Sequence, residues 1–219
     1  MNLKNFLIAA SILASSSIFG ATTVTFDVQA DTLRTSTGAI ASDGVVMLVA
    51  DTSGVGNFGA VQTGSSLTAG SFLDSGGKDL VLYSNTIQNT TQTAGAFTAF
   101  TPSITPGAGI YSKLASGDPL ALLWFPTLTS TSSTAAAGTS YGIYTGNGDA
   151  DGSNSWVTPS STSSGYKLYM FTQSAQLATG TNANSIGDAT LTVGAAPEPS
   201  RAILAALGMG ALLLRRRRR

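Results

Sequence analysis

Strict alternation of polar and apolar residues is the feature that most restricts the fold of this chain. Residues 23–30 (TVTFDVQA) alternate without a break, so their four apolar side chains lie on one face of an extended segment. This pattern predicts a strand that is buried on one side. Two other segments, 45–50 (VVMLVA) and 120–125 (LALLWF), are wholly apolar and bounded by Asp or Pro. Their shortness predicts strands, the first buried on both faces and the second central in its sheet.

Five further segments have the length and composition of strands: 79–84, 109–114, 140–144, 166–171 and 189–193. The connections are rich in Gly, Ser, Thr, Asn and Asp, which favour turns. A short helix over 60–67 is the one exception that we expect. The sequence therefore predicts a single all-β domain over residues 22–196, built as a two-sheet β-sandwich or jelly roll of eight or nine strands. The chain has no internal repeat that would favour a propeller or solenoid.

Two residue types are missing, and their absence excludes several kinds of catalysis. The chain has no His and no Cys, so it has neither an imidazole base nor a thiol nucleophile. Ser-His-Asp and Cys-His mechanisms, disulfides and zinc sites with His or Cys ligands are excluded. Residues 22–196 also lack Glu. We therefore expect a protein that is not an enzyme.

Residues 1–21 have the three parts of a secretory signal peptide. Lys4 gives a positive start, residues 6–14 are apolar, and residues 15–21 are mostly small. The apolar part is too short to span a bilayer. We expect the secretion machinery to export the chain, with signal peptidase cutting after Gly20 or Ala21.

Residues 197–219 form a second tripartite segment. It begins with Pro197, Glu198, Pro199 and Ser200, continues with an apolar run over 202–214, and ends with Arg215, Arg216, Arg217, Arg218 and Arg219. A helix over the apolar run reaches roughly 20 Å, short of a hydrocarbon core of about 30 Å, but arginines can snorkel toward the headgroups. The segment predicts a short transmembrane helix with the arginine block kept in the cytoplasm.

This tail resembles the PEP-CTERM sorting signal of Gram-negative bacteria. In that family an exosortase, a protease or transpeptidase embedded in the membrane, recognises the tail and cuts near the Pro-Glu-Pro motif. The resemblance implies export across the inner membrane, a transient anchor there, and then a place on the cell surface or in an extracellular matrix of exopolysaccharide or biofilm. It covers only a small part of the chain, and because the family is defined by its tail alone, it implies nothing about residues 22–196.

The distribution of charge argues against a nucleic-acid partner. Five consecutive arginines can bind polyanions, but here they follow an apolar run at the end of a chain with an export signal. Residues 22–196 hold ten Asp and four basic residues, a net charge of −6. A net negative charge of this kind favours solubility and repels anionic polymers.

One loop has part of the pattern of a calcium site. Asn147, Asp149 and Asp151 are oxygen-bearing residues at alternate positions, and Gly152 follows them. The position where an EF-hand loop places its bidentate Glu is Thr158. An ordinary polar turn explains the same residues, so we expect no cofactor, with Ca²⁺ as the alternative.

Two Asp-bearing turns raise a further alternative. Asp74-Ser75-Gly76 looks superficially like an aspartic-protease loop, in which two carboxylates share a proton. The other turn, which starts at Asp51, has an inserted residue, and the two turns are too close in the sequence to belong to two separate lobes. Turn formation is the simpler explanation.

Aromatic residues could provide a surface for binding sugars. The candidates are Tyr111, Trp124, Phe125, Tyr141, Tyr144, Trp156, Tyr166 and Tyr169. Trp124 lies in an apolar run and is expected in the core. Trp156 lies in a polar stretch and is the better candidate for stacking on a sugar ring, with anchoring of its loop to the core as an equal alternative. The sequence thus favours a structural or adhesive surface protein, with a carbohydrate-binding module for an exopolysaccharide as the alternative.

Overall fold

The domain is a two-sheet β-sandwich, as the sequence pattern predicts. The computed structural model describes residues 23–30, 33–41, 43–87, 98–129, 131–146, 153–170 and 188–194. Within these ranges the chain forms nine strands and one short 3₁₀ turn, and no α-helix. The expected signal peptide (1–21) and sorting tail (197–219) lie outside the described residues.

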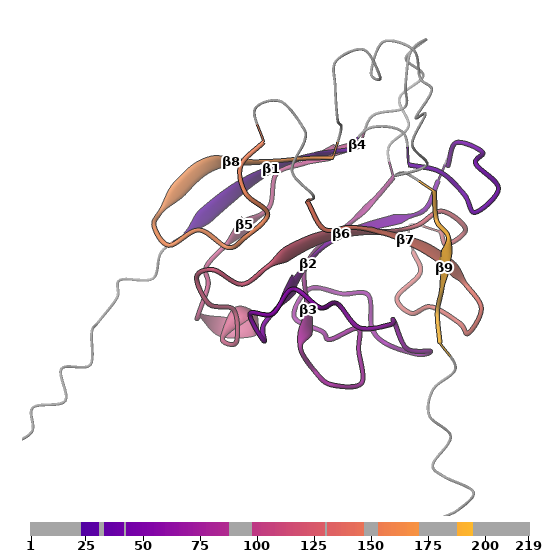
Figure 1. The fold of residues 1–219 in the computed structure, drawn as a ribbon, viewed down its shortest axis with the longest axis horizontal. Coiled ribbons are helices and arrows are strands. Elements are labelled where there is room, and N and C mark those ends of the chain that lie inside the picture. The colour runs from indigo at the N-terminus through magenta and orange to yellow at the C-terminus, as the bar shows by residue number, and fades with distance from the viewer. Residues whose placement is uncertain are drawn as a thin grey trace, which may run out of the picture.

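The first sheet has four strands, and β1 lies at its centre. On one side β8 runs parallel to β1, and on the other side β4 and β5 pair with it antiparallel, one after the other (Figure 1). The strands are β1 (Val24–Ala30), β4 (Thr98–Phe100), β5 (Ser103–Ile104) and β8 (Ser163–Met170). Burial alternates along β1 as expected for a strand with one face in the core.

The second sheet is antiparallel and has five strands in the order β3-β2-β6-β7-β9. The strands are β3 (Asp79–Thr86), β2 (Val45–Asp51), β6 (Leu120–Phe125), β7 (Ser140–Tyr144) and β9 (Leu191–Thr192). Figure 1 shows this sheet below the four-stranded one. The main core fills the space between them and includes Phe26, Leu48, Leu122, Trp124 and Leu168.

A layer of loops covers the outer face of the five-stranded sheet. Its buried side chains, Val61, Leu67, Leu73, Ala135 and Val193, pack on the second face of β2 and β6 and form with it the second core. For this reason every residue of both strands is buried. The predictions that residues 45–50 form a strand buried on both faces and that residues 120–125 form a central strand are confirmed.

A bulge in β8 brings its apolar residues onto the inner face. Thr25 pairs with Ser164 and Phe26 with Tyr166, so Gly165 has no partner on β1. Gly165 has a φ of 69°, which a residue without Cβ adopts at low cost. The ring of Tyr166 consequently meets that of Phe26 edge to face, with 5.8 Å between centroids.

Two predicted elements are wrong, and two strands were not predicted. Residues 60–67 form no helix, because Val61 and Leu67 both insert into the second core. Residues 109–114 form a 3₁₀ turn (Gly109–Tyr111) instead of a strand, since Gly109 has a φ of 55°. β4 and β5 have three and two residues, which is too short for a periodic pattern.

Candidate functional site

The sequence leaves two roles open for Trp156, an exposed platform and an anchor of its loop to the core, and the structure shows the second. Its side chain is only 6% exposed and belongs to the main core. The ring packs edge to face against Tyr144, with 5.1 Å between centroids. A Cβ at Gly146 would overlap it. The polar stretch around Trp156 therefore anchors a loop to the core, and this tryptophan cannot stack on a sugar in the folded domain.

The other predicted sites lie outside the described residues. They are the calcium candidates Asn147, Asp149 and Asp151, the sorting motif Pro197 to Ser200, and the block Arg215 to Arg219. In the part of the chain that the structure describes, no group of three or more acidic residues is placed to hold a metal ion. A search of the same part finds no helix with the length and hydropathy needed to cross a membrane.

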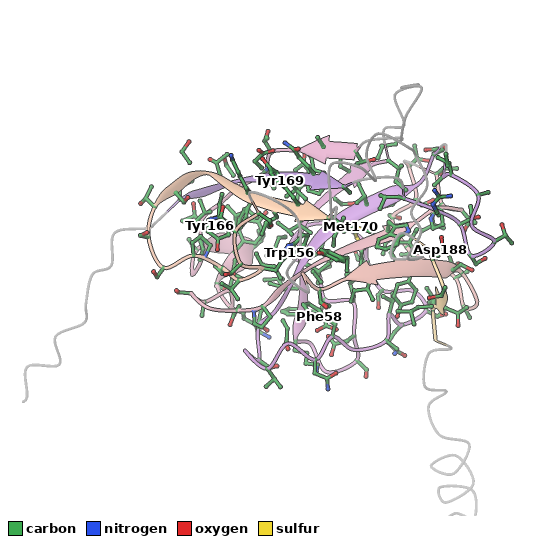
Figure 2. All side chains as sticks on the ribbon, turned by 45° about the horizontal axis from the view of Figure 1, so that its top comes forward. Phe58, Trp156, Tyr166, Tyr169, Met170 and Asp188 are labelled. Carbon is green, nitrogen blue, oxygen red and sulfur yellow. The ribbon has the colours of Figure 1, made fainter. Side chains whose placement is uncertain are left out.

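The outer face of the four-stranded sheet carries a polar network around an aromatic ring. Asp27 and Gln29 of β1 alternate with buried residues and so point away from the core. Lys167 and Tyr169 of β8 are their register partners. We call these four residues the Tyr169 face. Figure 2 labels Tyr169 and Trp156 on opposite sides of β8, in agreement with the burial of Trp156.

Hydrogen bonds fix the geometry of the Tyr169 face. The Tyr169 hydroxyl donates to Asp27 Oδ2 at 3.0 Å. Gln29 Nε2 donates to both carboxylate oxygens of Asp27, at 3.0 and 3.2 Å. Partial burial, and then the bond to the Asp27 carboxylate, raise the pKa of Tyr169. The hydroxyl therefore stays protonated at neutral pH, and the ring is held against a carboxylate and an amide.

The outer edge of β8 is closed by the segment that precedes Trp156. Asn154 donates its backbone N–H to the carbonyl of Lys167 at 2.7 Å, and its side-chain oxygen accepts the Lys167 N–H at 2.8 Å. Ser153 Oγ accepts the N–H of Tyr169 at 3.1 Å. These contacts satisfy backbone groups that an added strand would need. Binding at this sheet is therefore favoured on its face and not along the covered part of this edge.

A second polar cluster lies at one end of the five-stranded sheet. It consists of Asp51, Asp74, Asp79 and Asp118, and we call it the aspartate cluster. Asp51 at the end of β2 and Asp79 at the start of β3 are register partners. Asp51, Asp79 and Asp118 are 0%, 2% and 5% exposed. Such burial is unusual for Asp, so each carboxyl needs a structural explanation.

Asp51 and Asp74 hold backbone N–H groups of their own turns. Asp51 accepts bonds from the N–H groups of Ser53, Gly56 and Asn57, and from the Ser53 hydroxyl. Asp74 Oδ2 accepts the Gly76 N–H, while its Oδ1 accepts those of residues 78 and 79. These bonds bear out turn formation as the role of both residues.

The carboxyls of the cluster differ in acidity. Burial acts to raise the pKa of Asp51, but the bonds from Ser53, Gly56 and Asn57 outweigh it and leave the pKa lowered. Burial raises the pKa of Asp79 to about 6, although the bond from Gly59 opposes the shift. Burial also raises the pKa of Asp118. The pKa values of Asp51 and Asp79 shift in opposite directions because Asp51 accepts four hydrogen bonds and Asp79 accepts one.

Sequence reasoning did not find either arrangement. The Tyr169 face depends on the parallel register of β1 and β8, which lie near opposite ends of the domain's sequence. The aspartate cluster depends on the register of β2 and β3. The alternation of β1 was a usable signal for the outward direction of Asp27, but nothing in the sequence pairs it with Tyr169.

The geometry defines the class of protein: an all-β sandwich with one polar aromatic face and a buried acidic cluster. Comparisons of the chain with protein-family models, with curated proteins and with solved structures found no match.

Proposed function

We propose that this chain is an exported surface or extracellular-matrix protein that an exosortase-like enzyme sorts through residues 197–219. The observation that carries the proposal is the tail itself, in which Pro197-Glu198-Pro199 precedes an apolar run and five arginines. The signal-like residues 1–21 support the same route. The protein crosses the inner membrane of a Gram-negative cell, is anchored there briefly, and is then released or transferred to the surface.

The position of the last strand is compatible with such processing. Gly194 donates its N–H to the Val61 carbonyl at 2.9 Å, and its own carbonyl accepts the Thr63 N–H at 3.0 Å. Only Ala195 and Ala196 separate it from Pro197. Cleavage within the Pro-Glu-Pro motif therefore leaves every described strand and both cores intact. The role that we assign to the released domain is structural or adhesive, in a matrix of exopolysaccharide.

The sorting proposal predicts the effect of changing the motif. Replacing Pro197, Glu198 and Pro199 together by alanine should keep the full-length chain in the inner-membrane fraction of the producing cells. The matched control replaces Ala195 and Ala196 by serine and should be processed and reach the surface normally. Immunoblots of membrane and surface fractions measure both. Normal surface localisation of the triple variant would contradict the proposal.

The Tyr169 face favours a second candidate function, the binding of a neutral saccharide. An aromatic ring beside a carboxylate and an amide offers an apolar surface together with acceptors and donors for sugar hydroxyls. The net charge of −6 over residues 22–196 disfavours an anionic polymer, so we propose a neutral saccharide as the ligand. This candidate replaces the Trp156 site with a site on the outer sheet face.

Affinity electrophoresis in gels that contain a soluble neutral glucan tests this candidate. We expect the glucan to retard the wild-type chain, and Tyr169→Ala to weaken binding about tenfold, equivalent to roughly 1.4 kcal/mol. Tyr169→Phe keeps the ring and should retain most of the affinity. Thr192→Ala, on the exposed β9 of the other sheet, is the control and should bind as the wild type does. If the glucan retards Tyr169→Ala as strongly as it retards the wild-type chain, the interaction is not the one we describe.

A further inference from the structure

The loop of residues 52–60 is held by side chains from two neighbouring strands. Asp51, at the end of β2, accepts the N–H groups of Gly56 and Asn57. Asp79, at the start of β3, accepts the N–H of Gly59 at 2.6 Å. Lys78 Nζ donates to the carbonyl of Asn57 at 2.6 Å. Carboxyl groups of the aspartate cluster thus hold both halves of the loop.

Asp79 is the member of this arrangement that is incompletely bonded. Its side chain is 2% exposed, and its Oδ1 is a buried atom with no hydrogen-bond partner. Only Oδ2 is bonded, to Gly59. An ionised carboxylate in such a place is costly, because water cannot solvate the oxygen that lacks a donor. A protonated carboxyl carries no net charge and is tolerated there.

The charges around Asp79 also favour its protonated form. Asp74 lies beside it, since Asp74 Oδ1 accepts the Asp79 N–H at 2.9 Å. Asp51 is its register partner, and the carboxylates of both Asp74 and Asp51 repel a charge on Asp79. Lys78 attracts that charge. From β7, Tyr141 faces Asp79 as a neutral phenol whose pKa is raised by burial.

The fourth carboxyl of the cluster is farther along the same end of the sheet. Asp118 accepts the Ala115 N–H at 2.8 Å and interacts electrostatically with Asp51. It therefore disfavours additional negative charge in the cluster as a whole. Close packing leaves little room for relaxation, because a Cβ at Gly59 would lie 3.0 Å from Asp74 Cβ and 3.3 Å from Asp79 Oδ2.

We propose that protonation of Asp79 controls the closure of loop 52–60 over the end of the five-stranded sheet. The loop is closed while Asp79 is neutral. When Asp79 ionises, the bond from Gly59 favours the charge, but the cost of keeping the charged Oδ1 away from water outweighs it, so the loop opens and water reaches Oδ1. The switch is a property of the fold and does not depend on export. Export would only determine that the switch responds to the pH outside the cell.

The pKa of Asp79 places the transition near pH 6. The folded-state pKa lies above the ordinary value of 3.8, so the folded domain binds a proton that the unfolded chain releases. The stabilising contribution of this group is therefore complete below about pH 4 and is lost as the pH rises through about 6. By the same reasoning, the loop is closed at acidic pH and opens as the pH rises through about 6.

Hydrogen exchange measured by mass spectrometry on the full chain in mild detergent tests the proposal. After correction for intrinsic rates, we expect the protection of residues 56–59 to fall at least about fivefold between pH 5 and pH 7.5. Asp79→Asn should abolish this dependence on pH. Asp43→Asn changes an exposed carboxylate and should behave as the wild type does. Protection that stays constant in the wild type, or that changes equally in Asp79→Asn, would overturn the proposal.

A second measurement keeps the proposal testable if Asp79→Asn does not fold. Carboxyl ¹³C resonances of the wild-type chain report the titration of each Asp directly. We expect the Asp79 resonance to titrate near pH 6, together with the amide shift of Gly59. An Asp79 resonance that titrates at the ordinary value of an exposed Asp would overturn the proposal without any variant.

Discussion

Replacing Gly142 by alanine should lower the free energy of unfolding by about 3 kcal/mol. Gly142 on β7 is the register partner of Trp124 on β6. The indole lies across the glycine so closely that a Cβ at position 142 would overlap its six-membered ring. Trp124 cannot retreat easily, because it is fully buried and its Nε1 donates to the Arg34 carbonyl at 3.2 Å. The added methyl group must therefore displace the largest side chain of the core.

Urea unfolding of the full chain in mild detergent, followed by tryptophan fluorescence, measures this effect. Gly194→Ala is the matched control, since its added Cβ would meet the nearest atoms only at 3.7 Å, an ordinary contact distance. We expect the control to change stability by less than about 0.5 kcal/mol. Equal midpoints for the two variants would show that Trp124 does not pack on Gly142 as described.

Replacing Asp51 by alanine should cost a similar amount, about 3 kcal/mol. The substitution leaves three backbone N–H groups and the Ser53 hydroxyl without their acceptor, at a position with no exposure to water. Each of the three orphaned N–H groups carries a desolvation penalty of about 1 kcal/mol, whereas the hydroxyl can rotate toward another acceptor. The loop of residues 52–60 should lose its closed conformation before the sandwich unfolds.

The same unfolding measurement, combined with hydrogen exchange of residues 52–60, tests the prediction. Asp43→Ala removes an exposed carboxylate that accepts one backbone bond, from Gly44, and should cost less than about 1 kcal/mol. Asp51→Asn keeps an acceptor oxygen and should lie between the two. A loss for Asp51→Ala no larger than that for Asp43→Ala would contradict the role that we assign to Asp51.

Strands with strong periodicity could be predicted from the sequence. The alternation in residues 23–30 indicated β1 and the direction of Phe26, and the apolar runs indicated β2 and β6. The burial of β2 on both faces was also predicted, but its cause was not. The layer that covers the outer face is made of irregular loops, whose single buried residues, such as Val61 and Leu73, have no period to read.

Trp156 shows the main limit of reasoning from local composition. Its neighbours in the sequence are polar, yet the ring is in the core because Gly146 leaves space for it and Tyr144 packs against it. Tyr144 is the last residue of β7 and Gly146 follows it by two residues, so both contacts come from outside the polar stretch around Trp156. The network of Asp27 with Tyr169 was equally hidden, since it requires the register of two distant strands.

The central claim of this account is that residues 1–21 and the tail from Pro197 are removed during export. Intact-mass measurement of the protein recovered from the surface or medium of the producing cells tests it most directly. We expect a chain that starts at residue 21 or 22 and ends between residues 196 and 200, with or without an added group at its new C-terminus. Recovery of a chain that still carries the apolar run and Arg215–Arg219 would contradict the account.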